Sequence, residues 1–327
     1  IRDRDKLGPR LVATIGGILV GLGMILASLT TTSLGYALGF GVIAGAGIGF
    51  GYASATPPAV KWFPAAKTGM IAGIVVSGFG LASLYAAPLS SWLIGNFGLA
   101  TAVMALGVAF LVVVLALAQI LTPPPPGYVP AGTPPQPARG GAQRKEDYLP
   151  REMLRTWQFY VLWFMYACGA GAGLMIISKL AKIASAQAGL ELGFVLVAVL
   201  AVGNGAGRIV AGIASDKIGR KATMLISFTM QTVLILLLSQ TTEDSLLANM
   251  AVLGVVSALI GANYGANLSL FPSVTKDYYG LKNFGMNYGL VFTAWGFGGF
   301  MLALFAGKVY DATESFNFAY YLSLIHI

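Results

Sequence analysis

Long uncharged, apolar stretches recur along the whole chain, and they constrain the fold more than any other feature. A helix needs about 20 apolar residues to cross the hydrocarbon of a bilayer, where every backbone group must be bonded internally. The composition, 57% hydrophobic and 10% charged, excludes an ordinary soluble protein. The sequence therefore predicts an all-α, polytopic membrane helix bundle, with spans at about 11–29, 34–60, 68–94, 99–121, 159–177, 192–213, 222–240, 245–271 and 283–307.

The two ends of the sequence predict a fragment. A further apolar run begins near Ser315 and stops at Ile327, which allows about 20 Å of helix where the hydrocarbon needs about 30 Å. Residues 1–10 are polar and read as a loop between two spans. We therefore expect a bundle that is truncated at both ends.

A proline-rich segment divides the chain. Residues 122–148 mix proline with glycine and charge, which is typical of a solvated linker. The predicted domains are an N-terminal half (1–121), a linker (122–150) and a C-terminal half (151–327). If the spans alternate, the basic residues of both halves gather on the side of the linker, and only Lys179, Lys182 and Lys308 fall on the other side. This bias predicts a multi-pass protein of the plasma (inner) membrane with a cytoplasmic linker.

Several other classes of protein are disfavoured. The basic residues are scattered between apolar spans and make no continuous face, so nucleic acid is not an expected partner. The one cysteine, Cys168, excludes an internal disulfide and a thiolate metal cluster. The spans carry no cluster of His, Asp, Glu or Cys, and no P-loop is present, so we predict neither an enzyme nor a cofactor.

A loop signature occurs twice, as expected of a transporter built from two related halves. Each copy reads D-K-x-G followed by basic residues, and each precedes a span. The first copy contains Asp5, Lys6, Gly8 and Arg10, and the second contains Gly212, Asp216, Lys217, Gly219, Arg220 and Lys221. We expect these loops to act as gating elements, with Asp216 bonding to a neighbouring helix terminus in one conformation; the alternative is that they only fix the topology.

The second loop, Gly212–Lys221, resembles the cytoplasmic signature of the major facilitator superfamily. The stretches 45–52, 61–64, 271–273 and 287–289 resemble more narrowly the oxalate/formate antiporter family and related monocarboxylate transporters. The resemblance implies twelve spans in two pseudo-symmetric halves of six. The chain would then contain the third to sixth spans and the seventh to a truncated twelfth.

Arg208 is the charged residue that lies deepest within a predicted span. It precedes Asp216 by eight residues, roughly 12 Å along a helix, and intramembrane charge usually has a function. A guanidinium presents a planar two-donor fork that matches a carboxylate, so a small organic anion is the expected partner. Asn204 lies one turn away, where its amide could orient the guanidinium, bind substrate or join two helices. The alternative for Arg208 is a structural bond to helix carbonyls or to an acid outside this sequence.

The resemblance adds roles for further residues. It implies that Arg208 is the substrate anchor of the eighth span, and that Tyr52 and Tyr264 line the site. The oxalate exchanger has a lysine in its eleventh span where this chain has Trp295. A second carboxylate would then lack a cation, at a cost of several kcal/mol, so a monocarboxylate is favoured. For Tyr52, Tyr264 and Trp295, ordinary helix packing is the alternative.

These observations predict a secondary active transporter of small organic anions that works by alternating access between its two halves. The expected substrates are the monocarboxylates lactate, pyruvate, formate and acetate. Transport would be symport with a proton or antiport against a counter-anion, in contact with the lipid bilayer. Exchange of oxalate for formate is one alternative, and a membrane receptor or sensor for a carboxylate is another.

Overall fold

The computed structural model describes residues 4–125, 127–131, 147–189, 193–242, 244–314, 316, 318, 320 and 321. Within these ranges, nine helices are long and apolar enough to cross a membrane. Each overlaps one of the nine predicted spans, which confirms the all-helical membrane fold. The candidate spans are Gly8–Ser28, Ser33–Lys61, Thr68–Ala86, Pro88–Ala118, Trp157–Leu180, Val195–Ile218, Arg220–Ser239, Met250–Tyr279 and Phe284–Thr313.

The chain forms two compact units, and their division differs from the predicted one. Unit 1 comprises Ile1–Ala65 and Tyr85–Thr133, and unit 2 comprises Ala66–Leu84 and Pro134–Ile327. A segment that precedes the linker by many residues thus packs with the C-terminal part of the chain. The division into halves at the linker stays a prediction.

Unit 1 consists of α1 (Arg4–Ser28), α2 (Ser33–Tyr36), the π-helix η1 (Ala37–Ala44), α3 (Gly45–Lys61) and the later part of α4 (Thr68–Ala118). The helix pairs α1–α3 and α1–α4 approach each other closely, because a glycine lies where each pair meets. A Cβ atom on Gly47 of α3 would lie 2.6 Å from the Gly16 carbonyl oxygen of α1, and one on Gly17 would lie 2.7 Å from the Val114 side chain. In α4, Gly98 has φ 79°, and this break falls between the two spans that the sequence predicts there.

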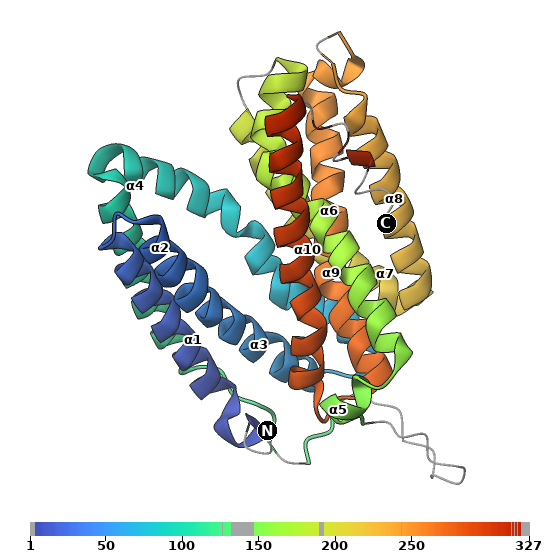
Figure 1. Ribbon diagram of the computed structural model, residues 1–327. Coiled ribbons are helices and arrows are strands. Elements are labelled where there is room, and N and C mark those ends of the chain that lie inside the picture. The colour runs from blue at the N-terminus through green and yellow to red at the C-terminus, as the bar shows by residue number, and fades with distance from the viewer. Residues whose placement is uncertain are drawn as a thin grey trace. The chain divides into compact units, whose positions relative to one another are not determined.

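Unit 2 is a bundle in which α6 (Trp157–Ala188), α7 (Gly193–Ile218), α8 (Arg220–Ser239), α9 (Met250–Tyr279) and α10 (Phe284–Thr313) lie side by side (Figure 1). The short helix α5 (Pro150–Met153) precedes them. Apolar side chains of α6 to α10 form the core, among them Ile176, Leu196, Ile235 and Ile260, and no more than 2% of the surface of any of these four is exposed.

Glycine also sets the spacing of α7 against its neighbours. A Cβ atom on Gly207 would overlap the backbone of Ala262 in α9. The first stretch of α4, residues 68–84, approaches α7 in the same way, since a Cβ atom on Gly69 would lie 2.6 Å from the Gly212 carbonyl oxygen. Small residues at such positions let membrane helices approach closely and gain van der Waals contact. The backbone of α7 is therefore held between α9 and the beginning of α4.

This packing predicts that Gly207→Ala destabilises the protein, because the added methyl group must push α7 and α9 apart. Overpacking costs about 1–3 kcal/mol, so the apparent unfolding temperature of the detergent-purified protein should fall. Gly296→Ala is the matched control, because a Cβ atom on Gly296 meets nothing within 4 Å. Equal unfolding temperatures for the two variants would contradict the packing.

Candidate functional site

Arg208 lies on α7 with none of its surface exposed, and Asn204 on the same helix is 8% exposed. The Nε atom of Arg208 donates a hydrogen bond to Asn204 Oδ1 at 3.0 Å. The two residues are four apart, so their side chains meet on one face of the helix. Asn204 therefore orients the guanidinium; its contact with a substrate stays a prediction.

The other side of the guanidinium faces α4. Nη1 of Arg208 donates to the backbone carbonyl of Val76, and the guanidinium carbon lies 5.4 Å from the centroid of the Phe79 ring. A Cβ atom on Gly80 would lie 3.0 Å from the Arg208 Nε atom, so glycine at this position leaves room for the side chain. The sequence does not predict these partners, because a backbone carbonyl can belong to any residue type.

The acceptors that receive these two bonds, an amide oxygen and a backbone carbonyl, are neutral. A hydrogen bond from a guanidinium to a carboxylate is about twice as strong as a bond between neutral groups. The bond to a helix carbonyl is also the contact expected if Arg208 has only a structural role. Arg208 therefore has a position that suits an anion, and an anion would have to enter a place where none of the side chain is exposed.

Tyr264 of α9 and Trp295 of α10 are in direct contact. The indole Nε1 of Trp295 donates to the Tyr264 hydroxyl at 2.9 Å, and the indole stacks on Phe292 with ring centroids 5.4 Å apart. Tyr264 is 3% exposed. The structure thus joins two of the predicted site residues into one aromatic cluster. Tyr52 belongs to unit 1, so its role in the site remains a sequence-based prediction.

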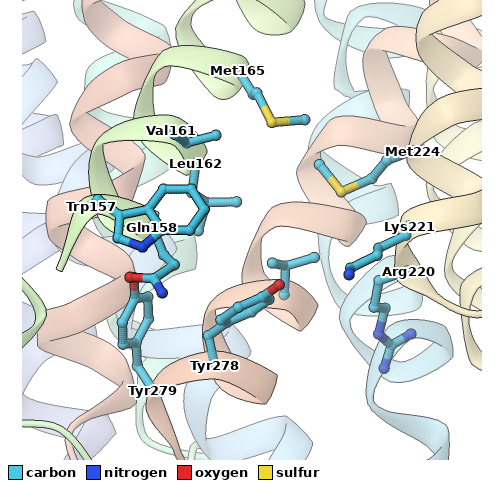
Figure 2. Close-up of a pocket in the computed structure, with 11 residues that line it drawn as sticks. Trp157, Gln158, Val161, Leu162, Met165, Arg220, Lys221, Met224, Tyr278 and Tyr279 are labelled. Atoms are coloured by element: carbon cyan, nitrogen blue, oxygen red, sulfur yellow. The ribbon is translucent and has the colours of Figure 1, made fainter.

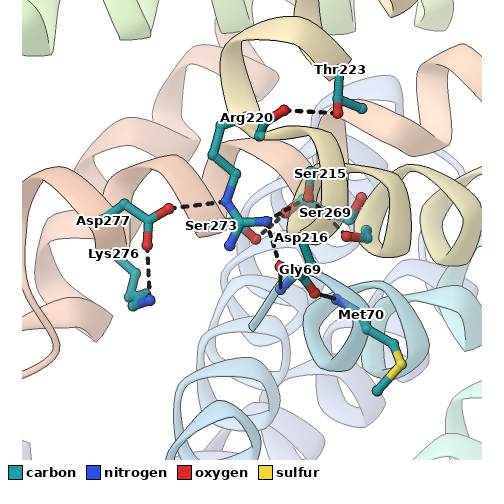
Figure 3. Close-up of polar contacts among 12 residues, drawn as sticks. Gly69, Met70, Ser215, Asp216, Arg220, Thr223, Ser269, Ser273, Lys276 and Asp277 are labelled. Carbon is teal, nitrogen blue, oxygen red and sulfur yellow. Dashed lines mark hydrogen bonds and ion pairs between the residues drawn. The ribbon is translucent and has the colours of Figure 1, made fainter. Parts of the chain in front are cut away.

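Asp216, at the end of α7, bonds to the first turn of α4 (Figure 3). Its two carboxylate oxygens accept hydrogen bonds from the backbone amides of Gly69 and Met70, at 3.0 and 2.8 Å. Unpaired amides and the positive end of the helix dipole both favour an acid at this place. The bond to a helix terminus, which the sequence analysis expects of Asp216, is therefore present; its gating role remains a proposal.

Arg220 extends this contact to α9 (Figure 3). Its Nη1 atom lies 2.6 Å from Asp216 Oδ1, and its Nε atom lies 2.9 Å from Asp277 Oδ2. Lys276 also pairs with Asp277, at 2.8 Å. Neither Asp277 nor Lys276 has a functional signature in the sequence, apart from being a charge at the end of an apolar span. The ends of α7, α8 and α9 and the start of α4 are thus joined by one network.

The glycine of each D-K-x-G loop has a backbone conformation that L side chains rarely adopt. Gly8 has φ 67° and ψ 158°, and Gly219 has φ 91° and ψ 156°. A residue with a Cβ atom would be strained at either position. Lys217, Lys221 and Arg10 are exposed. The side chains of Asp5 and Lys6 lie outside the described part of the chain, so their contacts stay predictions.

A cavity of about 420 Å³ lies at the end of the bundle that carries Arg220 and Lys221 (Figure 2), and its lining does not include the predicted substrate residues. Apolar side chains of α6, α8 and α9, including Leu162, Met224 and Val274, form its wall. Apolar residues at helix ends have no sequence pattern that indicates a cavity, so this cavity could not be predicted from the sequence.

The candidate spans of the described residues, together with a repeated charged loop, are typical of polytopic membrane transport proteins. The sequence model of the Major Facilitator Superfamily matches residues 4–300, and the chain belongs to this family. The family consists of membrane transporters, not enzymes.

Relatives and solved structures agree with this assignment. The chain is 28% identical to the "Uncharacterized MFS-type transporter YhjX" of Escherichia coli over 90% of this chain and 70% of that one. It is 30% identical to the "Oxalate:formate antiporter" of Oxalobacter formigenes, over 89% of this chain and 66% of that one. The chain thus spans about two thirds of the length of these relatives. A stretch covering 28% of this chain is 35% identical to monocarboxylate transporter 13 of Rattus norvegicus.

Two solved structures show the same fold. The transporter FucP, in its outward conformation, matches with a TM-score of 0.66 at 16% identity, over 98% of this chain and 81% of that one. The human organic anion transporter MFSD10 matches with a TM-score of 0.67 at 14% identity, over 98% of this chain and 76% of that one.

The bonds of Asp216 predict slow hydrogen exchange at the amides of Gly69 and Met70. Hydrogen bonds to a charged group contribute about 1.5–3 kcal/mol, so Asp216→Ala should speed exchange of these amides about 10- to 100-fold. Mass spectrometry of peptides covering residues 66–72 measures this. Lys217→Ala is the control, since Lys217 is adjacent and exposed. Unchanged exchange in Asp216→Ala would contradict the bonds.

Proposed function

We propose that the protein is a secondary transporter of small monocarboxylates, such as lactate, pyruvate, formate or acetate, and that it works by alternating access. The observation that carries the proposal is the guanidinium of Arg208, which is fully buried in a candidate membrane span. Its bonds to Asn204 and Val76 are to neutral oxygens. A buried cation of this kind favours an anionic ligand.

The energetic reason is desolvation. Taking a charge out of water costs several kcal/mol, and neutral acceptors recover only part of this. A carboxylate carries the opposite charge and can accept two parallel hydrogen bonds from a guanidinium fork. Asn204 accepts from Nε and Val76 accepts from Nη1, and these two bonds fix the orientation of the guanidinium that such a ligand would meet.

Trp295 supports a substrate with a single negative charge. In the oxalate exchangers that the chain resembles, a lysine occupies the corresponding position and suits a second carboxylate. Here an indole occupies it, with its N–H bonded to Tyr264 and its ring stacked on Phe292. A dianion would bring a second negative charge against this aromatic cluster. Among the charged side chains of the described residues, only Arg208 is fully buried, which supports a substrate with one carboxylate.

Exchange of oxalate for formate is the second candidate, and a relative supports it. The Oxalobacter formigenes protein that is 30% identical over 89% of this chain is described as an oxalate:formate antiporter. The two candidates differ in substrate charge. Competition by oxalate at low concentration against lactate uptake would favour the exchanger.

We further propose that the basic end of the bundle, with Arg220 and Lys221, faces the cytoplasm of a cell with the protein in its plasma (inner) membrane, in line with the positive-inside rule. The movement of substrate would be coupled to a proton or to a counter-anion. A carboxylate receptor would bind the same ligand without moving it. Flux of labelled lactate into liposomes that contain the full-length protein separates a carrier from a receptor.

The anchor role predicts that Arg208→Gln and Arg208→Lys both lose transport of labelled lactate and formate in proteoliposomes. Removing one partner of a buried charge pair costs about 2–5 kcal/mol, which corresponds to a loss of about 30-fold or more in kcat/KM. Lys308→Gln is the control for a loss of positive charge, because Lys308 is exposed. Undiminished transport in both Arg208 variants would remove the proposed anchor.

If Trp295 disfavours a second carboxylate, Trp295→Lys should shift the substrate preference towards oxalate. The new ammonium group would compensate a second carboxylate, so oxalate should compete with labelled lactate at a concentration about tenfold lower than in the wild type. Trp295→Gln removes the ring without adding charge and should not improve competition by oxalate. Equal competition by oxalate in the two variants would contradict the proposed role of residue 295 in selecting the substrate charge.

A further inference from the structure

A backbone carbonyl of α4 occupies one hydrogen-bonding arm of Arg208. The Nη1 atom donates to Val76, the Phe79 ring lies beside the guanidinium, and no part of the arginine is exposed. The Val76 carbonyl occupies only one of the five N–H donors of the guanidinium, but a carboxylate cannot reach this fully covered side chain unless a helix beside it moves. Binding of a carboxylate to Arg208 is therefore linked to the position of α4.

We infer that the substrate carboxylate displaces the Val76 carbonyl from Arg208, and that this exchange of acceptors releases this part of α4 from α7. The inference rests on the proposed function, because it takes Arg208 as the group that binds the carboxylate. It goes further by assigning the backbone of Val76 as the competitor of the substrate and Gly80 as a positioning residue.

Replacing the Val76 carbonyl by a carboxylate at Arg208 is electrostatically favourable. A carboxylate carries the charge opposite to that of the guanidinium, and its two oxygens can accept two parallel hydrogen bonds from the fork. The released carbonyl is not left without a donor, because in a helix the oxygen of residue 76 faces the amide of residue 80. The complex therefore gains an ion pair and loses only the second bond of a carbonyl that has two lone pairs.

Gly80 makes the bonded arrangement possible. A Cβ atom at this position would lie 3.0 Å from the Arg208 Nε atom and 3.0 Å from the backbone of Gly205. A side chain at residue 80 would therefore crowd the guanidinium and the α7 backbone, and glycine leaves room for both. Gly78, two residues earlier on the same helix, meets nothing within 4 Å and has no such requirement.

The segment 68–84 of α4 has a second attachment to α7. Asp216 holds the amides of Gly69 and Met70 in the first turn, and Arg208 holds Val76 about two turns further along. A carboxylate ligand competes for Arg208 alone. Substrate should therefore loosen α4 around Val76 and Gly80 while the end bonded to Asp216 stays attached.

Disulfide formation between α4 and α7 tests the inference in the full-length protein. A Cβ atom on Gly205 lies 2.6 Å from the Leu81 Cγ atom, so cysteines at positions 81 and 205 are within the reach of a disulfide. The test protein carries Leu81→Cys and Gly205→Cys, with the native Cys168 changed to Ala. Saturating lactate should slow oxidation of this pair about tenfold, which requires that the ligand prefer the released state by more than about tenfold.

Two controls isolate the exchange of acceptors. Lactamide has the shape of lactate without its charge, and it should leave the oxidation rate unchanged. Adding Arg208→Gln should remove the effect of lactate. An oxidation rate that lactate does not change, in a protein whose lactate transport depends on Arg208, would overturn the inference and leave the proposed function standing. Lactate transport that is independent of Arg208 would overturn the proposed function itself.

Hydrogen exchange gives a second measurement that needs no cysteine pair. In the unmodified protein, lactate should speed amide exchange of peptides covering residues 76–84, whereas lactamide should not. Peptides covering residues 66–72 should keep their protection, because Asp216 still holds that end. A uniform response of both segments, or none in residues 76–84, would contradict the release of α4 by the substrate.

Discussion

A guanidinium buried between two helices is the interaction on which the other features depend. None of the surface of Arg208 is exposed, so water cannot solvate its charge. The helices around it must therefore supply hydrogen-bond acceptors. Asn204 supplies one from α7 itself, and Val76 supplies another from the α4 backbone. The close approach of α4 to α7 at Gly69 and Gly80 is the packing that lets a backbone carbonyl reach the arginine. Glycine packing and charge burial are thus parts of one arrangement.

The charged loop at the end of α7 belongs to the same arrangement. Asp216 satisfies amides at the start of α4, and Arg220 connects it to Asp277 of α9. Gly219 has a positive φ angle that turns the chain from α7 into α8, and Gly8 has the same conformation in the other copy of the loop. The repeat in the sequence therefore corresponds to a repeated backbone conformation. In our proposal, the substrate acts on the Arg208 attachment of α4, and the loop holds the other end.

The spans and the central residues of the candidate site could be predicted from the sequence, because each has a direct chemical signature. Uncharged runs mark the spans, a lone charge marks Arg208, and a spacing of four marks Asn204 as its neighbour. Positions that depend on the backbone could not be predicted. The Val76 carbonyl has no residue-type signal, and the packing of residues 66–84 with the C-terminal unit depends on tertiary contacts. The contact between Tyr264 and Trp295 also arises only when α9 and α10 pack together.

The most direct test of the account is a measurement of proximity between Arg208 and a bound carboxylate. Solid-state NMR of the full-length protein in lipid, with guanidinium nitrogens labelled with ¹⁵N and lactate labelled with ¹³C at its carboxyl carbon, detects dipolar coupling between the two groups. We predict a coupling that is present in the wild type and lost in Arg208→Gln. Bound lactate that shows no coupling to any arginine, or the same coupling in Arg208→Gln, would contradict the central role of Arg208.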